Sequence, residues 1–387
     1  MIRGVFLSDS GIQGETSPDF ASAVLRTTTG GTAPLLALSS GMQARDLAGT
    51  WSTMWFDEEH STGRLAAAAT QANGAATALS LTDGSSVVPG QFYLVEKTGE
   101  RIFVTDVSGN TLTVVRGFQD TGASAAAIAT GDYIQRIGTA FSEASEAPTA
   151  VYEQGIPYWN VTQIFRTAWD VSNTTSVITY KTGDKVANSR AQAAFTHAED
   201  IERTLWFGRR WVASQGGKRI ATMGGVDYYN TQNITNIATG TASTYASIDA
   251  FLSSVFLHQI QGKPQERLAF CGNTAVGVLN AIAKSNTTMN IVPGATTFGM
   301  KVFQWISPYG QISLMTHPMF NANPTWSKDL RILHPGAMTV CYLRRTKEYT
   351  VGETGRDAKA GGFTTEMTTE FRCPKTAGAL RNINLAG

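Results

Sequence analysis

Apolar and small residues recur at three- and four-residue intervals between Asn188 and Gln215, which places them on one face of a helix. Asn188 or Ser189 can accept a backbone hydrogen bond at its start, and the pair Gly216–Gly217 can turn the chain at its end. The pattern therefore predicts a single long helix over 188–215. The apolar stripe consists of Ala191, Ala194, Phe195, Ala198, Ile201, Leu205, Gly208 and Val212.

Before this helix, short runs of alternating apolar and polar residues predict strands. Between residues 65 and 138 these runs are TALSLT, QFYLVEK, RIFVTDV, TLTVVRG and DYIQRIG. Turn sequences at 98–99 and 108–110 join the middle three, so we expect an antiparallel β module. The flanking segments Trp51–His60 and Tyr152–Tyr180 also look extended, and we expect them to form two legs of one long hairpin. The residues expected on a shared face of the module are Phe92, Leu94, Ile102, Val104, Leu112 and Val114.

After the long helix, helical and extended patterns alternate. We expect helices over SIDAFLSSVFLHQIQ, with Ser247 or Asp249 near its start, and over NTAVGVLNAIAKS. The segments ERLAFCGN, MKVFQWISPYGQISLMTHP, LRILHPGAMTVCYLRR and FTTEMTTEFRCP predict strands, the second one folded back at a turn over residues 307–310. His317 and His334 each precede a proline, and we expect each to end a strand. The pattern predicts a compact mixed α+β domain.

The charge balance argues against a protein whose main affinity is for nucleic acid. The chain has 31 Lys and Arg against 30 Asp and Glu, and only 16% of its 387 residues are charged. Binding to phosphate needs clustered positive charge, and residues 1–46 contain no block of Lys or Arg. A weakly charged polar surface suits contact with other protein, because little repulsion keeps such surfaces apart.

The cysteines and the hydrophobicity point to folding in a cytoplasm. Cys271, Cys341 and Cys373 are odd in number and widely spaced, which fits neither a disulfide framework nor a CxxC metal pair. We expect buried, reduced thiols. The sequence contains no run of 18 or more apolar residues, so we expect no membrane-spanning segment.

The motifs that mark catalytic and cofactor sites are missing from the sequence. It contains no GxxxxGK[ST], HExxH or GxSxG motif. Glu199 and Glu202 are three positions apart, which can indicate a carboxylate pair for acid–base chemistry. Arg203 and the pair Arg209–Arg210 lie close by on the predicted helix, so a surface ion-pair network is favoured. We expect no enzyme activity, no cofactor and no metal.

The predicted helix also carries an excess of positive charge. Between Asn188 and Arg219 six basic residues stand against three acidic ones. An exposed face that meets nucleic acid or an acidic neighbouring subunit, and a merely solvated face, both remain open. His197 stands beside Glu199 and Asp200, and we expect it to make a solvated or inter-subunit polar contact.

Five longer stretches of the sequence are KTGERIFVTDVSGNTLTVVRGF, NVTQIFRTAWDVS, HAEDIERTLWFG, TFGMKVFQWISPYGQISLMTHPMF and YLRRTKEYTVGETGRDAKAGGFTTEMTTEF. Together they resemble the major capsid proteins of tailed bacteriophages that have the Hong Kong 97-like fold. The similarity is to the subgroup with a small β domain inserted in the extended-loop region, and it covers nearly the whole chain from about Trp51.

The resemblance implies an α+β chain with the Hong Kong 97-like layout. Residues 187–240 would form the peripheral domain with its long spine helix, and residues 241–345 the axial domain around five-fold and six-fold centres. The other parts would be an N-terminal arm (1–46), two extended-loop legs (47–64 and 139–186), the inserted antiparallel β domain (65–138) and a return to the peripheral domain (346–387).

The resemblance further implies a subunit that assembles with itself into the pentamers and hexamers of an icosahedral shell. The shell would enclose double-stranded DNA, form in the bacterial host cytoplasm and become part of the virion. Other implied partners are a portal and separate scaffolding or decoration proteins, and no membrane is involved. The candidate inter-subunit contacts are Trp159, Phe165, Trp169, Glu199, Glu202, Arg203, Arg209 and Arg210.

Three other interpretations remain open. The same fold builds encapsulin nanocompartments, which hold enzymes, and isolated particles would then contain a cargo protein where a phage shell contains DNA. Residues 65–138 alone would also suit a β-rich binding module, which would be monomeric when expressed by itself. An enzyme ranks third, because it would need a perturbed acid or base that the sequence does not display.

Overall fold

The structure is a computed structural model that describes residues 43–71, 77–118, 126–152, 154–180, 183–285, 290–297, 300–351 and 356–385. The chain forms two compact units, one of residues Met1–Trp55 with Tyr158–Gly387 and the other of Phe56–Pro157. Most of the expected N-terminal arm lies outside the described residues. Each unit has its own hydrophobic core, so each is described by itself.

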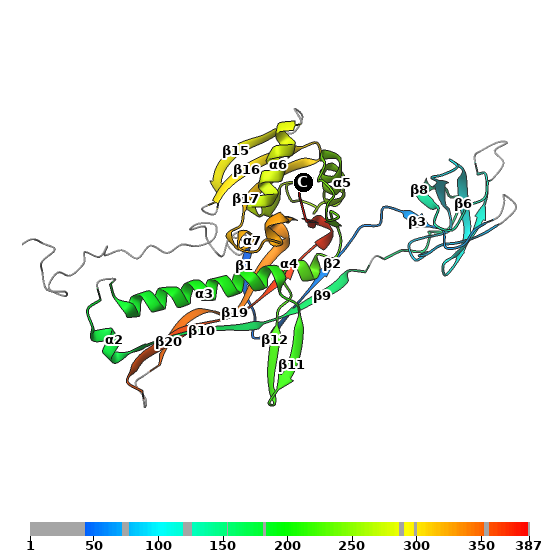
Figure 1. Ribbon diagram of the computed structural model, residues 1–387. Coiled ribbons are helices and arrows are strands. Elements are labelled where there is room, and N and C mark those ends of the chain that lie inside the picture. The colour runs from blue at the N-terminus through cyan, green and yellow to red at the C-terminus, as the bar shows by residue number, and fades with distance from the viewer. Residues whose placement is uncertain are drawn as a thin grey trace, which may run out of the picture. The chain divides into compact units, whose positions relative to one another are not determined.

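The long helix of the larger unit is α3 (Lys185–Phe207), drawn in green in Figure 1. The Asp184 carboxylate caps it by accepting a hydrogen bond from the Val186 N–H at 2.8 Å. The helix therefore begins three residues earlier and ends eight residues sooner than the sequence pattern predicts. It ends at Gly208, where a Cβ atom would lie 2.5 Å from the Thr204 carbonyl oxygen and 2.6 Å from that of Met223.

The predicted last turns of the helix are a β-hairpin instead. Strand β11 (Trp211–Gln215) pairs antiparallel with β12 (Lys218–Thr222), and no third strand joins them in the described part of the chain. Gly216 and Gly217 have φ angles of +57° and +74°, the left-handed conformation that a two-residue hairpin turn needs. The prediction that Arg209 and Arg210 lie on the helix is wrong, because both follow the Gly208 break.

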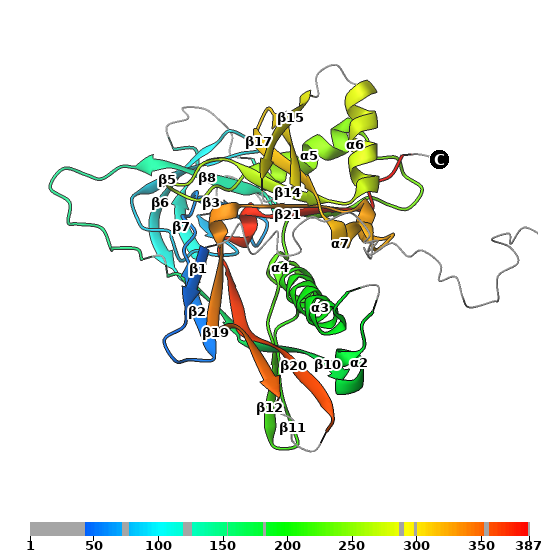
Figure 2. The same ribbon diagram turned by 90° about the vertical axis from the view of Figure 1, so that its left-hand side faces the viewer.

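Helix α3 packs along a four-stranded sheet in the order β1-β19-β20-β10 (Figure 1). Strands β19 and β20 are the longest, and Figure 2 shows them running side by side as a long ribbon. The core between helix and sheet gathers Trp206, Phe320 and Met367, all nearly inaccessible to water. The bounds are β1 (Gln43–Asp46), β10 (Gln163–Ser172), β19 (Met338–Val351) and β20 (Ala358–Phe371).

The edge strand β1 is anchored by side chains as well as by its ladder. Arg45 donates to the carboxylate of Glu370, which is 1% exposed, and through Nε to the Cys341 Sγ at 3.2 Å. Thr53 Oγ1 also donates to Glu370, at 2.7 Å. Burial works against ionisation of Glu370, but the bonds from Thr53, Arg372 and Arg45 prevail and lower its pKa.

The second sheet of the larger unit has seven strands in the order β13-β21-β18-β14-β17-β16-β15. The strand β14 pairs parallel with β17 and antiparallel with β18, so the sheet mixes both kinds of pairing. The bounds are β13 (Ile234–Asn236), β14 (Arg267–Cys271), β15 (Asn290–Thr297), β16 (Met300–Ser307), β17 (Gly310–Thr316), β18 (Leu330–Leu333) and β21 (Gly378–Arg381).

The helices and turns beside this sheet confirm several local predictions. Helix α6 (Asn273–Ser285) has the predicted bounds. Helix α5 (Tyr245–Phe256) has a capping box between Thr244 and Ser247, so it begins two residues before the predicted segment and ends five residues before that segment does. The turn between β16 and β17 falls where it is predicted, and His317 and His334 each follow the end of a strand. The remaining short helices are α2 (Asn173–Val177), α4 (Val226–Tyr229), α7 (Pro318–Asn321), η2 (Trp326–Lys328), η3 (Pro335–Ala337) and η4 (Pro374–Thr376).

The smaller unit, residues 56–157, folds around a six-stranded sheet in the order β3-β8-β5-β6-β7-β4. A bridge between Ala67 and Leu81 joins the two outer strands, so the sheet closes into a small barrel and leaves no long open edge. The bounds are β3 (Arg64–Ala66), β4 (Ala78–Ser80), β5 (Gln91–Val95), β6 (Arg101–Ser108), β7 (Thr111–Val115) and β8 (Tyr133–Thr139).

The prediction of which β5 side chains point into the core is wrong, because it is shifted by one residue. Tyr93 and Val95 are buried in the barrel, whereas Phe92 and Leu94 are half-buried on its outer side. Phe92 packs there near Phe118. A shift of one residue moves every side chain of a strand to the other face, and a register irregularity falls between Phe92 and Tyr93. The four members predicted on β6 and β7 do lie inside.

Strand β2 (Ser52–Asp57) leads toward the smaller unit, and β9 (Ile156–Val161) leads back from it. The two strands pair with each other, which agrees with the start of the predicted long hairpin. The rest of the predicted second leg differs, because β10 pairs with β20 and Asn173–Val177 form the helix α2. Their side chains alternate between the core and water: Trp55 is 2% exposed, whereas Met54 and Phe56 are more than half exposed. The leg therefore presents apolar residues that the folded subunit does not cover.

Candidate inter-subunit surfaces

The outer side of α3 carries the ion pairs that the sequence predicts for Glu199 and Arg203. Arg203 donates to the Glu199 carboxylate one turn away and lies 3.5 Å from that of Asp200. These side chains are partly or largely exposed, so each pair contributes little to stability. The pairs therefore form a charged and partly exposed face of the helix.

Glu202 does not belong to this surface network, so that part of the prediction is wrong. Its side chain is buried, and Oε1 accepts hydrogen bonds from His317 Nε2 at 2.9 Å and Trp206 Nε1 at 3.2 Å. The other ring nitrogen of His317 accepts from the Met319 N–H at 3.2 Å, which fixes the proton on Nε2. Phe270 and Phe320 pack around the pair, so it ties the helix to the start of α7 inside the core.

His197 is also buried, which contradicts the expected solvated or inter-subunit contact. It is 3% exposed, and its ring nitrogens lie 3.1 Å from Thr167 Oγ1 and 2.8 Å from Thr365 Oγ1. Burial lowers the pKa of His197, although the charge of Asp200 partly opposes this. Its bonds join α3 to β10 and β20 within one subunit.

The three aromatic candidates on the outgoing leg differ in exposure. Phe165 and Trp169 are 6% and 8% exposed and pack against α3 and β20. Trp159 is 39% exposed, and the Arg210 guanidinium lies 3.7 Å above its ring. Arg210 Nη1 also donates to the Trp159 carbonyl oxygen at 2.7 Å. Of the three, Trp159 is the one with substantial surface left for a neighbour.

The β11–β12 hairpin forms an exposed surface that the sequence analysis missed. Trp211, Val212 and Ile220 are 57%, 40% and 41% exposed. Trp211 and Ile220 share one face of the hairpin, whereas Val212 is on the other face with Arg219, which lies 4.1 Å from the ring of Trp51. The signal was present in the sequence, since two glycines between the runs WVASQ and KRIAT are a strong hairpin pattern.

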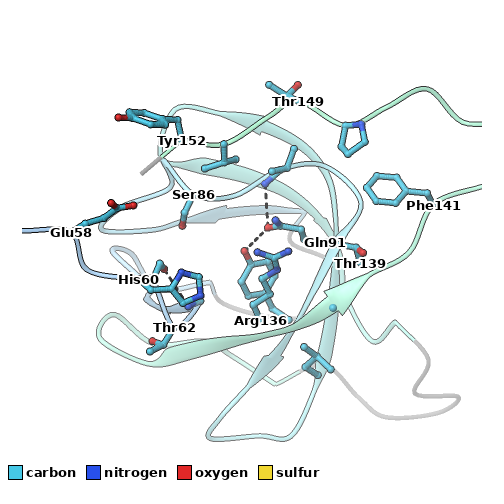
Figure 3. A pocket seen from close by; sticks show the side chains of 18 residues that line it. Glu58, His60, Thr62, Ser86, Gln91, Arg136, Thr139, Phe141, Thr149 and Tyr152 are labelled. Atoms are coloured by element: carbon cyan, nitrogen blue, oxygen red, sulfur yellow. Dashed lines mark hydrogen bonds between the residues drawn. The ribbon is translucent and has the colours of Figure 1, made fainter. Parts of the chain in front are cut away.

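The smaller unit has an open groove of about 830 Å³ (Figure 3). Gln91 lies at its base, where its Oε1 accepts from Tyr93 OH at 2.7 Å and from the Val88 N–H at 3.2 Å. Burial raises the pKa of Tyr93 to about 12, so the phenol stays protonated at neutral pH. Phe141 and Tyr152 line the outer part of the groove and are largely exposed, which suits binding better than chemistry.

A second hollow, of about 620 Å³, lies in the larger unit, and its charged residues serve the fold. Arg331 pairs with Asp227 at 3.0 Å and with Asp329 at 3.3 Å, and Arg381 lies 3.5 Å from Asp227. Burial raises the pKa of Asp329 despite the opposing charge of Arg331. These four charged residues pair with one another, so they form a structural ion-pair network beside the hollow.

Within the described residues, no group of three or more His, Cys, Asp or Glu side chains is arranged to hold a metal ion. None of the helices there is both long enough and apolar enough to cross a membrane.

Comparison with known proteins gives consistent matches. A family model described as the SU10 major capsid protein matches residues 8–384. A major capsid protein of Pseudomonas phage PaMx41 is 28% identical over 370 residues, which cover 92% of this chain and 87% of that protein. Among solved structures, the capsid of the cyanophage P-SCSP1u has a TM-score of 0.51 at 9% identity and covers 98% of this chain and 97% of its own.

A further solved capsid shares the fold. The capsid of a native GTA particle has a TM-score of 0.50 at 9% identity, and the match covers 98% of this chain and all of that one. At such low identity these two structures establish only that the chains fold alike.

Proposed function

The chain belongs to the SU10 major capsid protein family, and from this membership we propose which parts of the subunit build the shell. It is a tailed-phage major capsid protein with the Hong Kong 97-like fold, and it forms an icosahedral capsid. The observation that carries this conclusion is the match of the family model to residues 8–384, nearly the whole chain. The family is a structural one and not a class of enzymes.

We propose that the folded units correspond to the parts of such a subunit. Helix α3 with the β1-β19-β20-β10 sheet would be the peripheral domain, and the seven-stranded sheet with α5 and α6 the axial domain. The barrel would be the inserted domain of residues 65–138, with 47–64 and 139–186 as the legs of the extended loop. The barrel has a hydrophobic core of its own, which supports separating it from the larger unit. Within the larger unit, α5 and α6 pack on the seven-stranded sheet around a core that is distinct from the one next to α3.

We propose that contacts between subunits use the exposed members of the predicted set. Trp159, Glu199, Arg203, Arg209 and Arg210 keep surface that a neighbour can bury. The other three predicted residues are Phe165, Trp169 and Glu202. Their side chains pack inside the subunit, so they would affect the contacts only by stabilising the fold beneath the surface.

We propose that the shell is built from pentamers and hexamers and encloses double-stranded DNA. Many weak contacts acting together would stabilise it, which agrees with a nearly neutral and weakly charged chain. A portal and separate scaffolding or decoration proteins would complete the head. The subunit would be made and assembled in the cytoplasm of a bacterium, since the curated relative comes from a Pseudomonas phage.

The assembly test is expression of the chain alone and together with the other head genes, followed by size-exclusion chromatography and negative-stain microscopy. Closed shells or capsomer rings are expected. A chain that stays monomeric under every condition would contradict the proposal. Nucleic-acid content then separates a phage shell from an encapsulin-like compartment, which would hold protein cargo.

Two variants separate assembly from folding in the same experiment. Trp159→Ala removes an exposed side chain, so the monomer should stay folded while the yield of shells falls. Trp169→Ala removes a buried one and should cost the monomer about 3–5 kcal/mol. Circular dichroism and urea unfolding of the monomers read out the fold. Equal loss of monomer stability in both variants would contradict the assigned roles.

A further inference from the structure

One face of the β11–β12 hairpin carries exposed apolar side chains. Opposite residues in an antiparallel pair share a face, so Trp211, Ile220 and Lys218 lie together, with Ala213 between them. Arg219 lies on the other face, over Trp51. A two-stranded hairpin is only marginally stable in water by itself. The exposed face of this one therefore gains stability from a partner that covers it.

The same hairpin and its approach are strongly basic. Arg209, Arg210, Lys218 and Arg219 fall between Phe207 and Asp227, and the sequence between those two positions contains no Asp or Glu. Arg210 and Arg219 lie over tryptophan rings. Arg209 and Lys218 are exposed, and in the described part of the subunit neither takes part in an ion pair.

The segments that lead into and out of the barrel have the opposite charge. Residues 56–63 and 139–157 contain six Asp or Glu and no Lys or Arg. Glu58, Glu143 and Glu146 are exposed. Apolar side chains stand among these charges, and the exposed ones are Phe56 (64%), Phe141 (48%), Val151 (44%), Tyr152 (85%) and Ile156 (52%).

We propose that the hairpin face of Trp211, Ile220 and Lys218, together with Arg209, docks on the acidic segments of a second copy of this chain. Resting on the proposed function, this contact gives the shell one of its subunit interfaces. The two surfaces are complementary. Each carries exposed apolar side chains, and the charge is positive on the hairpin and negative on the acidic segments. Such a contact between two different patches is heterologous, so it can repeat around a ring.

A second copy fits the hairpin better than nucleic acid does. Phosphate would engage the arginines and the lysine, but it would leave Trp211 and Ile220 exposed to water. The acidic segments offer carboxylates and exposed aromatic rings together. Burying aromatic side chains at the centre of a contact and keeping charges at its rim is the arrangement that protein interfaces favour.

The test exchanges the charges of the two surfaces. One variant carries Arg209→Glu and Lys218→Glu, another carries Glu143→Lys and Glu146→Lys, and a third carries all four changes. Each of the first two should lower the yield of shells by about tenfold or more, because each weakened contact repeats throughout the particle. The third should regain most of the wild-type yield. Lys263→Glu, an exposed charge elsewhere in the chain, is the matched control and should assemble normally.

The outcomes separate this contact from the proposed function as a whole. Wild-type chain that forms no shell overturns both. With wild-type shells present, normal assembly of the Arg209→Glu, Lys218→Glu variant overturns the contact alone. Shells of normal yield but reduced DNA content would instead assign the hairpin to the genome. Failure of the four-change variant, with circular dichroism showing folded subunits, overturns direct pairing of the two surfaces.

Discussion

Glu202 on α3 accepts a hydrogen bond from His317 Nε2 at 2.9 Å, in a core where both side chains are almost fully buried. The two residues are 115 positions apart in the sequence. Their bond joins the long helix to the end of β17, where the two sheets of the larger unit meet the same core. A polar link of this kind is costly to break from one side, because the remaining partner stays buried without its bond.

Replacement of Glu202 should therefore destabilise the subunit. Glu202→Ala leaves the His317 and Trp206 donors without their acceptor, which should cost about 3 kcal/mol. Glu199→Ala, one turn earlier and partly exposed, should change stability by less than about 0.5 kcal/mol. Urea unfolding of the unassembled subunit measures both. Similar midpoints for the two variants would show that the buried link contributes little.

Two glycines should respond to alanine in opposite ways. A Cβ on Gly208 would press on the carbonyl oxygens of Thr204 and Met223, so Gly208→Ala should cost about 1–3 kcal/mol. Gly277 lies inside α6 with nothing within 4 Å of a Cβ. Gly277→Ala should stabilise the subunit by up to about 1 kcal/mol, since alanine favours a helix. Thermal unfolding should show a lower melting temperature for Gly208→Ala and a higher one for Gly277→Ala than for the wild type. A change in the same direction for both variants would contradict the packing described for these two glycines.

The stability of the subunit should fall in mild acid. Burial lowers the pKa of His197 below the 6.5 of a free histidine, so the unfolded chain binds the proton more readily. The stability from neutral His197 is present above pH 6.5 and is lost as the pH falls from there through the folded-state pKa. The pKa of His334 is also lowered, first by burial and then by the charge of Arg267, so its effect on stability has the same direction.

The urea concentration at the unfolding midpoint, measured at about pH 7.5 and about pH 5.5, tests this. These two pH values lie on either side of the pKa of a free histidine. The wild type should lose more stability between them than His197→Gln, whose amide can still bond Thr167 and Thr365. The double variant with His334→Gln should lose least. A wild-type pH slope retained in His197→Gln would show that another group is responsible.

The three thiols should differ in reactivity in the unassembled subunit. Cys373 is partly exposed, whereas Cys271 and Cys341 are fully buried. Burial, with the charge of Glu370, raises the pKa of Cys341 to about 11, and burial also raises the pKa of Cys271. Labelling with iodoacetamide near neutral pH, read by peptide mass spectrometry, should modify Cys373 first.

The variant Arg45→Met extends the thiol experiment to β1. Arg45 bonds both Glu370 and the Cys341 sulfur, so its loss should loosen the edge strand over that thiol. Labelling of Cys341 should then accelerate while labelling of Cys271 stays slow. Unchanged protection of Cys341 would mean that the backbone ladder alone holds β1 in place.

Prediction from the sequence succeeded where the decisive interactions are local. The α6 helix, the turn at 307–310 and the strand ends before His317 and His334 depend on residues a few positions apart. It failed at Gly208, because a glycine that fits the helical stripe was in fact needed for a close approach to Met223. The apolar spacing of Val212 continued the pattern by chance, inside what is a strand.

The candidate inter-subunit contacts were harder to predict, because distant parts of the chain decide whether a side chain is exposed. Trp159 and Trp169 lie on neighbouring strands of one leg and look alike in the sequence, yet the first is 39% exposed and the second 8%. Trp169 packs against β20, where its ring lies beside Gly361. No local pattern reports which face of an extended strand a remote part of the chain will bury.

The sequence by itself determined the α+β class, most of the elements, the family and hence the role of the chain as a shell subunit. Only the tertiary structure decided that Glu202 and His197 serve the core while Glu199 and Arg203 remain at the surface. The physical reason is that helix and strand formation depend on neighbouring residues, whereas a buried polar group needs a partner that the fold brings from far away. For Glu202 that partner is His317, and for His197 it is Thr365.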